Sequence, residues 1–395
     1  MSTPSDSGPP ASRFGFQWDN FRYDFERSVV VHPDYEMLHL ATRTFFLPGY
    51  PELKAESRLV ELKPFLLSYG RTPAERCIEQ VRRAMKVNHP GLAQVFGAVF
   101  DADKQPYLHL EHLRGCFLLT LLEVAVSLGR KLSPAFAAYV AAELAEALDH
   151  VHRRRDEEGL ALNLVHRAVG PMRVRVGVGG RVQLTHLGVL YAELLGRLYS
   201  APEVLRGDLA YLAPELVRGL FHEEPAAGDV LTPPGLDGRA DVFSLGLVLL
   251  EMLLARHPLK AAHALWLDVE ARFPTSGRAN TPQLVELGTL ANRVLHFGPE
   301  EVLHAADVVP EPLQRIVAKA LRANPDERYS SASDMHNDLC CYLLGLKPAY
   351  GAKEVAEEAS DILMHAAELE GVPSHAAFKQ GGLASPPDRG PETLN

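Results

Sequence analysis

The sequence predicts an α+β fold in which a small, β-rich part precedes a larger, mainly helical part. Residues 14–110 mix short apolar runs, such as Ser28–Val31, with one helical segment at Pro73–Val87. Beyond residue 110 the apolar side chains recur mostly at helical spacing. With 395 residues, 47% of them hydrophobic, the chain is long enough to form both parts and still leave tails.

Two helices are predicted from their local sequence. Ser133 is a favourable N-cap and Pro134 suits the first helical position, so a core helix is expected over Ser133–Arg153. Its apolar residues follow a helical period: Phe136, Tyr139, Val140, Leu144, Leu148 and Val151. The most apolar stretch, Val242–Ala255, is interrupted by Glu251 and is too short to span a bilayer, which indicates a buried helix.

A further helix is expected over Ala352–Gly371, where apolar side chains form one stripe beside acidic residues. The stripe comprises Val355, Ala359, Ile362, Leu363, Ala366 and Leu369. We expect it to pack on the chain's own helical part, because most amphipathic helices serve their own domain. Docking on a partner's helix or groove is the alternative. The Pro- and Gly-rich segment His222–Gly238 is typical of a surface loop, and residues 1–13 and 373–395 are typical of disordered tails.

Charge and cysteine content narrow the class of protein. The formal net charge of −10 argues against general binding to nucleic acid or to an anionic membrane. The four cysteines, Cys77, Cys116, Cys340 and Cys341, show no paired metal-ligand spacing, and two adjacent cysteines are a poor disulfide pair. Since the sequence also shows no signal peptide, a reducing cytoplasm is the expected location.

The most informative segment is His166–Val174, which is followed after a glycine-rich turn by Leu184–Gly188. Together these segments resemble the catalytic loop and metal-binding motif of eukaryotic-like bacterial Ser/Thr protein kinases. Further matches follow in the order of that family and cover roughly residues 30–345. They are Val60–Lys63, His89–Leu92, Tyr107–Leu113, Tyr211–Glu215, Asp241–Gly246 and Asn324–Tyr329.

The resemblance implies a bilobal protein-kinase-like fold. The N-lobe would comprise residues 14–111 and the C-lobe residues 112–346, with a surface insertion at 222–238. The amphipathic helix would follow at 347–372.

The residues that would perform the chemistry are replaced. In the family, an Asp acts as the catalytic base, and an Asn and a second Asp hold magnesium. The matching positions here are Ala168, Arg173 and His186. None of these side chains supplies the carboxylate or amide oxygen that magnesium requires, so no metal site is expected. For His186 a packing or hydrogen-bonding role is favoured over zinc ligation, because no partner ligand stands nearby in the sequence.

The nucleotide pocket implied by the resemblance is altered as well. The family's Gly-rich loop is missing, since Gly15 and Gly49 are the only glycines between residues 14 and 63. Glu61 and Arg175 stand where the family places a small residue and an apolar residue against adenine. Either they meet as an ion pair that occupies the adenine site, or one or both point to solvent.

Lys63 matches the family's phosphate-pairing lysine. Its usual helix partner, a Glu, falls on Gln80, with Glu79 one residue away. An exposed or purely structural lysine is therefore favoured over a phosphate ligand. The other pocket positions implied by the resemblance are Leu110, Glu111 and Leu113.

Residues that the family uses for architecture are present, among them His166 and Arg167. Glu215 and Arg328 match a buried ion pair that ties the activation segment to the large lobe, and Asp241 matches the carboxylate that anchors the catalytic-loop backbone. Breaking one partner of a buried pair costs about 3–5 kcal/mol, so stability alone can keep such residues after catalysis has been lost.

Loss of catalytic groups within a retained frame predicts a pseudokinase. Its expected role is regulatory or scaffolding, in bacterial signalling, through binding of an active kinase or another signalling protein. No cofactor is expected. The alternative is a residual Ser/Thr protein kinase that binds ATP and magnesium in an unusual pose, for which Asp208, Glu79 and Glu61 are the acidic candidates.

Overall fold

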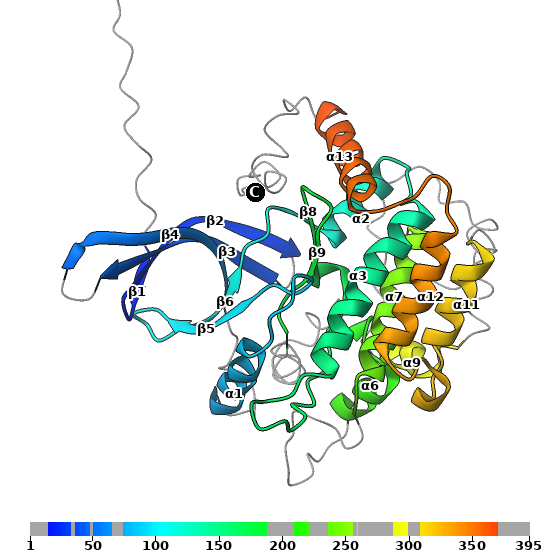
Figure 1. The fold of residues 1–395 in the computed structure, drawn as a ribbon, viewed down its shortest axis with the longest axis horizontal. Helices are drawn as coiled ribbons and strands as arrows, with labels where there is room; N and C mark the ends of the chain where they lie inside the picture. The colour runs from blue at the N-terminus through cyan, green and yellow to red at the C-terminus, as the bar shows by residue number, and fades with distance from the viewer. Residues whose placement is uncertain are drawn as a thin grey trace, which may run out of the picture. The chain divides into compact units, whose positions relative to one another are not determined.

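The computed structural model describes residues 15–32, 36–47, 50–64, 74–187, 209–221, 236–255, 259, 287–298 and 309–369. These residues form an α+β fold, as predicted (Figure 1). The predicted tails and most of the predicted insertion lie outside the described residues.

The chain divides into two compact units. We call residues 1–65 and 96–112 the sheet unit, and residues 66–95 and 113–395 the helical unit. The chain passes finally from the sheet unit to the helical unit after residue 112, next to the predicted boundary after residue 111. The segment 66–95, which the resemblance assigns to the N-lobe, groups with the helical unit.

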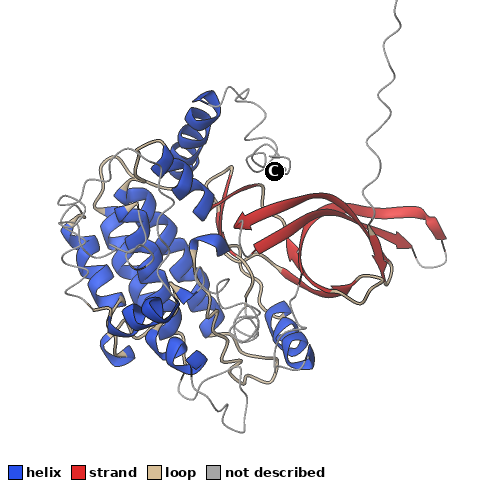
Figure 2. Cartoon of the chain, turned by 180° about the vertical axis from the view of Figure 1, so that it is seen from behind, coloured by secondary structure: helices blue, strands red, loops and turns tan. Residues whose placement is uncertain are grey.

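The sheet unit is built on a single sheet in the order β1-β2-β3-β4-β6-β5. Its strands are β1 (Phe16–Trp18), β2 (Phe21–His32), β3 (Glu36–Leu47), β4 (Tyr50–Pro64), β5 (Val95–Phe100) and β6 (Pro106–Glu111). Pairing is antiparallel from β1 through to β6. Figures 1 and 2 show that the sheet curls strongly round on itself, as long twisted strands do.

Aromatic rings fill the concave face of this curled sheet. Phe16 stacks on Tyr23 and on Tyr107, with ring centroids 5.0 and 5.5 Å apart. The ring of Trp18 on β1 lies 4.9 Å from that of Phe100 on β5. The two edge strands are therefore in contact through their side chains, although they are not hydrogen-bonded neighbours. The apolar core of the unit comprises Tyr23, Ala41, Val60, Leu62, Val99 and Tyr107.

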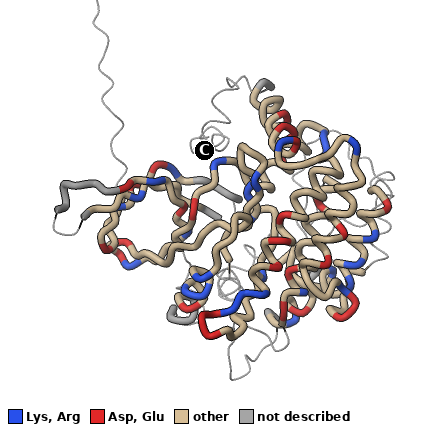
Figure 3. Tube along the Cα trace, in the orientation of Figure 1, with Lys and Arg blue, Asp and Glu red and all other residues tan. Residues whose placement is uncertain are grey.

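The helical unit contains one small sheet and a series of helices. Its strands are β7 (Gly115–Phe117), β8 (Val174–Gly177) and β9 (Val182–Leu184), and its helices are α1 (Ala74–Met85), α2 (Leu118–Ser127), α3 (Pro134–His152), α6 (Pro214–Phe221), α7 (Arg239–Leu254), α9 (Leu287–His296), α11 (Glu311–Ala320), α12 (Ala332–Leu344) and α13 (Ala352–Leu369). Figure 3 shows acidic and basic residues interspersed along these helices. No helix in the described part of the chain combines the length and the apolar character that crossing a bilayer requires.

The two predicted core helices begin and pack as their sequences indicate. The Ser133 hydroxyl accepts a hydrogen bond from the Phe136 amide at 3.0 Å, and Pro134 takes the first position of α3. Helix α7 is buried from Ala240 to Leu254 and packs against α3, α11 and α12. A Cβ at Gly246 would lie only 2.8 Å from the Cβ of Ala320, so the missing side chain permits the close approach of α11.

Helix α13 packs on its own unit, as expected, against α2, α3 and β8. Its apolar stripe is buried at Val355, Ala359, Ile362, Leu363 and Ala366. The carboxylate of Glu358 accepts hydrogen bonds from the Ser133 amide at 2.7 Å, the Ser133 hydroxyl at 2.6 Å and the Tyr350 hydroxyl at 2.6 Å. One side chain thus joins α13 to the N-cap residue of α3.

Replacing Glu358 by Ala should lower the free energy of unfolding by about 2 kcal/mol, because three donors lose a charged acceptor. The measurement is urea unfolding followed by circular dichroism. Glu357→Ala is the matched control, since Glu357 forms only an exposed 3.6 Å pair with Lys353 and should change stability by less than about 0.5 kcal/mol. Equal effects of the two substitutions would show that Glu358 does not hold α13.

Candidate functional site

The carboxylate of Asp241, in the first turn of α7, anchors the segment that contains His166 and Arg167. It accepts the backbone amides of His166 and Arg167 at 2.8 and 2.7 Å, and Nε2 of His152 at 2.8 Å. Burial by itself would raise the pKa of Asp241, but the hydrogen bond and charge of His152 lower it below its usual range. The carboxylate is therefore ionised and holds two consecutive amides of the predicted catalytic loop.

The backbone of this region is strained in two places. Arg167 and His186 have φ angles of 67° and 65°, in the left-handed region that costs a residue with a Cβ roughly 1–2 kcal/mol. The two segments are also tied together, because Nε2 of His166 donates to the Thr185 carbonyl and the Thr185 amide donates to the Arg173 carbonyl, both at 2.8 Å. Such strain persists only where surrounding structure imposes it, and it is typical of functional sites.

The three positions that the resemblance matches to the family's catalytic groups lie in this frame and are buried. Ala168 is 5% exposed, and Arg173 and His186 are fully buried. Burial lowers the pKa of His166 despite the nearby charge of Asp241, and the charge of Arg173 adds to the lowering. Nδ1 of His186 lies 2.6 Å from the Thr185 hydroxyl, so this histidine has a local hydrogen-bonding role.

This arrangement does not fit magnesium. The three positions offer a methyl group, a guanidinium and an imidazole, whereas magnesium takes oxygen ligands. No group of three or more His, Cys, Asp or Glu side chains in the described part of the chain is arranged to hold a metal ion. No step that passes through a bound metal can be derived from these residues.

Arg175, on β8, binds the segment that joins the two units. Its Nη2 donates to the Leu113 carbonyl at 2.8 Å, and its guanidinium carbon lies 4.4 Å from the centre of the Phe117 ring. The side chain is 3% exposed. The Arg175 side chain therefore hydrogen-bonds to the backbone carbonyl of Leu113, which is one of the predicted nucleotide-pocket positions.

Glu61 and Lys63, on β4, are 1% and 2% exposed. Oε1 of Glu61 accepts a hydrogen bond from Nδ1 of His112 at 2.8 Å. All three side chains are buried, so the alternatives that Lys63 is exposed and that Glu61 or Arg175 points to solvent are wrong, whereas a purely structural role for Lys63 stays a prediction. A Glu61–Arg175 ion pair would join the two units, and it stays a prediction.

The remaining predicted pocket positions fall in both units. Leu110 and Glu111 end β6, where Leu110 pairs with Glu61 and Glu111 with Val60. Gln80 is buried on α1, whereas Glu79 is half-exposed and pairs with Arg82 and Arg83 at 3.6 and 3.8 Å. Asp208 lies outside the described residues.

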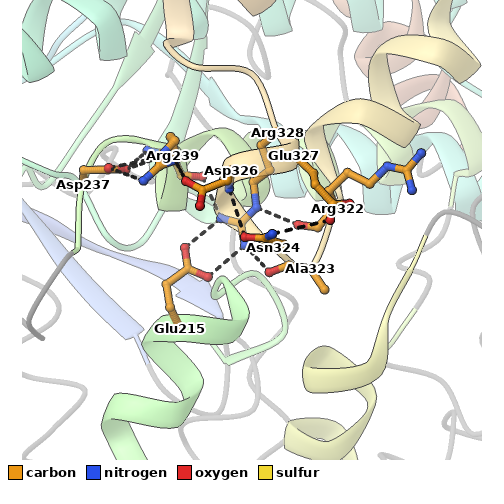
Figure 4. Close-up of polar contacts among 9 residues, drawn as sticks. All are labelled: Glu215, Asp237, Arg239, Arg322, Ala323, Asn324, Asp326, Glu327 and Arg328. Atoms are coloured by element: carbon orange, nitrogen blue, oxygen red, sulfur yellow. Dashed lines mark hydrogen bonds and ion pairs between the residues drawn. The ribbon is translucent and has the colours of Figure 1, made fainter.

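The predicted ion pair between Glu215 and Arg328 is present and bidentate (Figure 4). Nη1 and Nη2 of Arg328 lie 2.7 and 2.9 Å from the two carboxylate oxygens. The same guanidinium donates to the carbonyls of Arg322, Ala323 and Arg239. The Arg328 guanidinium thus joins the start of α6 to α7 and to the turn that contains Asn324 and Pro325. The Arg328 side chain has no exposed surface.

Sequence reasoning missed two residues that shape the site. His152 donates a hydrogen bond to the carboxylate of Asp241, and His112 donates one to the carboxylate of Glu61. His112 follows a predicted pocket position directly, which is the one signal that points to it. Nothing in the local sequence of α3 distinguishes His152 from its other polar residues.

Comparison with known proteins agrees with this geometry. The protein kinase domain family matches residues 68–340. The chain belongs to this family. Among curated kinases, it is 27% identical over 249 residues to the tyrosine-protein kinase MasK of Myxococcus xanthus, a match that covers 62% of this chain and 36% of MasK. It is 26% identical over 264 residues to the serine/threonine-protein kinase PknB of Mycolicibacterium smegmatis, covering 66% of this chain and 34% of PknB.

The chain thus spans about a third of the length of these kinases. Among solved structures, the kinase domain of PknI from Mycobacterium tuberculosis superposes with a TM-score of 0.50 at 18% identity, over 84% of this chain and 99% of that domain. This likeness confirms the protein-kinase fold.

The Arg328→Ala variant should lose about 3–5 kcal/mol of unfolding free energy, because Glu215 would keep a charge without its buried partner. Thermal or urea unfolding measures the loss. Arg315→Ala is the control, since Arg315 forms an exposed 2.9 Å pair with Glu311 that is worth about 0–1 kcal/mol. A loss in Arg328→Ala no larger than in the control would contradict an architectural role for this ion pair.

Proposed function

We propose that this kinase-family protein is a pseudokinase, which acts in bacterial signalling as a regulatory or scaffolding partner and not as a catalyst. The observation that carries the proposal is the fully buried guanidinium of Arg173, at the position where the family places a magnesium-binding Asn. Ala168 and His186 complete the loss, since neither supplies a base or a metal-binding oxygen of the required kind.

The physical argument rests on what phosphoryl transfer requires. Catalysis of this reaction consists almost entirely of positioning and of charge stabilisation by magnesium. A buried guanidinium repels a divalent cation, and a methyl group at Ala168 accepts no proton from a substrate hydroxyl. Arg175 adds a second obstacle, because it binds the Leu113 carbonyl at a predicted nucleotide-pocket position.

The alternative is a residual Ser/Thr protein kinase with ATP and magnesium as cofactors. The names of MasK and PknB favour it, as does the retention of Lys63. It requires acidic groups that converge on a metal. Of the candidates, Glu61 is bound to His112 and Glu79 faces Arg82 and Arg83 on the surface of α1. The pseudokinase is therefore the better supported function.

A pseudokinase acts by being recognised, so the functional ligand we propose is another protein, such as an active kinase or another signalling protein. Retention of the frame around Asp241, Glu215 and Arg328 supports this role, because a folded surface is what such a partner would bind. We propose that the protein works in the cytoplasm.

The proposal is tested by the melting temperature of the protein with ATP and with magnesium, with manganese or without metal. A ligand that binds only the folded state stabilises it by about 2.7 kcal/mol at a hundred times its dissociation constant. We expect no shift under any of these conditions. A shift that requires the metal, disappears in Lys63→Met and persists in the surface control Lys353→Met would contradict the proposal.

A further inference from the structure

The concave face of the sheet unit carries a polar cluster that has no part in the pseudokinase proposal. Tyr23, Arg43, Arg58 and His109 come from β2, β3, β4 and β6. Arg43 stands opposite Tyr23 on one side and opposite Arg58 on the other. Directly opposed residues of antiparallel strands share a face, so the two guanidinium groups lie side by side.

Aromatic rings hold these side chains in place. The guanidinium carbon of Arg43 lies 4.5 Å from the centre of the Phe21 ring, and that of Arg58 lies 4.1 Å from the centre of the Phe96 ring. The Tyr23 hydroxyl lies 3.4 Å from Nδ1 of His109, whose ring centre is 4.9 Å from that of Phe96. Such packing restricts the rotamers of both arginines.

Three polar atoms of the cluster lack partners. Nε of Arg43, Nε of Arg58 and Nε2 of His109 are buried without a hydrogen bond, and His109 is only 3% exposed. Among the described residues, no carboxylate forms an ion pair with either guanidinium, although Glu56 acts on Arg43 at longer range. Like charges directly opposed across two strands destabilise a sheet, and buried polar groups without partners cost free energy.

We propose that this cluster is a binding site for a phosphate-type oxyanion, held by the guanidinium groups of Arg43 and Arg58, with one further donor from the hydrogen-bonded pair of Tyr23 and His109. Guanidinium groups bind such anions through several parallel N–H donors. Arg43 and Arg58 are partly exposed, so an ion can reach them from solvent while their Nε atoms stay buried.

The charge of the cluster favours a doubly charged anion. Burial, together with the smaller effect of the charges of Arg43 and Arg58, lowers the pKa of His109 to about 3. His109 is therefore neutral at pH 7, so the two arginines supply the positive charge of the site, with Asp19 and Glu56 as the carboxylates that act on it at longer range. A phosphate monoester carries about −1.5 to −2 at this pH, which matches two guanidinium groups better than a single carboxylate does.

This site is distinct from the family's nucleotide pocket. Successive side chains of a strand point to opposite faces, so Arg58 shares its face of β4 with Val60 and Leu62. Glu61 and Lys63, the nucleotide-pocket positions of β4, belong to the other face. Binding of an oxyanion here is therefore independent of whether the chain binds a nucleotide.

The test is the melting temperature of the whole chain in sodium phosphate, sodium sulfate or O-phosphoserine, against sodium chloride at equal ionic strength, which removes general screening. Phosphate or phosphoserine should raise the melting temperature above the chloride value, and Arg43→Gln or Arg58→Gln should abolish the rise. Arg22→Gln is the control, because Arg22 lies on β2 and already pairs with Asp24 at 2.8 Å. This control should respond like the wild type.

A further variant and a comparison between two anions complete the test. If either Gln variant fails to fold, Arg58→Lys keeps the charge without the planar fork and should weaken the phosphate midpoint by about tenfold. A rise with phosphoserine but not with inorganic phosphate would support the site and identify a phosphate monoester as its ligand. No rise above chloride with any anion, or a rise that persists in both Gln variants, would overturn the proposal.

Discussion

A buried carboxylate, Asp241, forms the interaction on which the rest of the helical unit's architecture depends. It binds two consecutive amides of the segment at His166 and Arg167 and one imidazole, and these bonds keep it ionised inside the protein. Because α7 is buried along nearly its whole length, the carboxylate is fixed in the core. The left-handed conformations at Arg167 and His186 are imposed by this surrounding frame.

The same frame is what would keep a kinase fold in a protein that has lost catalysis, as we propose for this chain. Asp241 and the pair Glu215–Arg328 serve stability, since removing one partner leaves a buried charge uncompensated. Ala168, Arg173 and His186 lie within the frame but contribute nothing to it that requires an acid or an amide. On the proposed function, stability accounts for the first group of residues, and the second group need not match the family because phosphoryl transfer is not required.

The features that the sequence predicted well are local or belong to ordered motifs. The Ser133 cap, the burial of α7 and the Glu215–Arg328 pair all follow from short segments. The features that it missed depend on register between distant strands. Glu61 meets His112 across 51 residues, and Arg175 meets Leu113 across 62 residues. The burial of Lys63 and the juxtaposition of Arg43 with Arg58 likewise arise from the alignment and curl of the sheet, which no local pattern specifies.

The most direct test of the account is the transfer of labelled γ-phosphate from ATP, in magnesium and in manganese, to the protein itself and to a general protein substrate. The account predicts incorporation no greater than that of the heat-unfolded protein, because no described acid replaces the groups lost at Ala168, Arg173 and His186. Incorporation by the wild type that disappears in Lys63→Met would contradict it, since the transfer would then depend on the nucleotide-contacting position of a working kinase site.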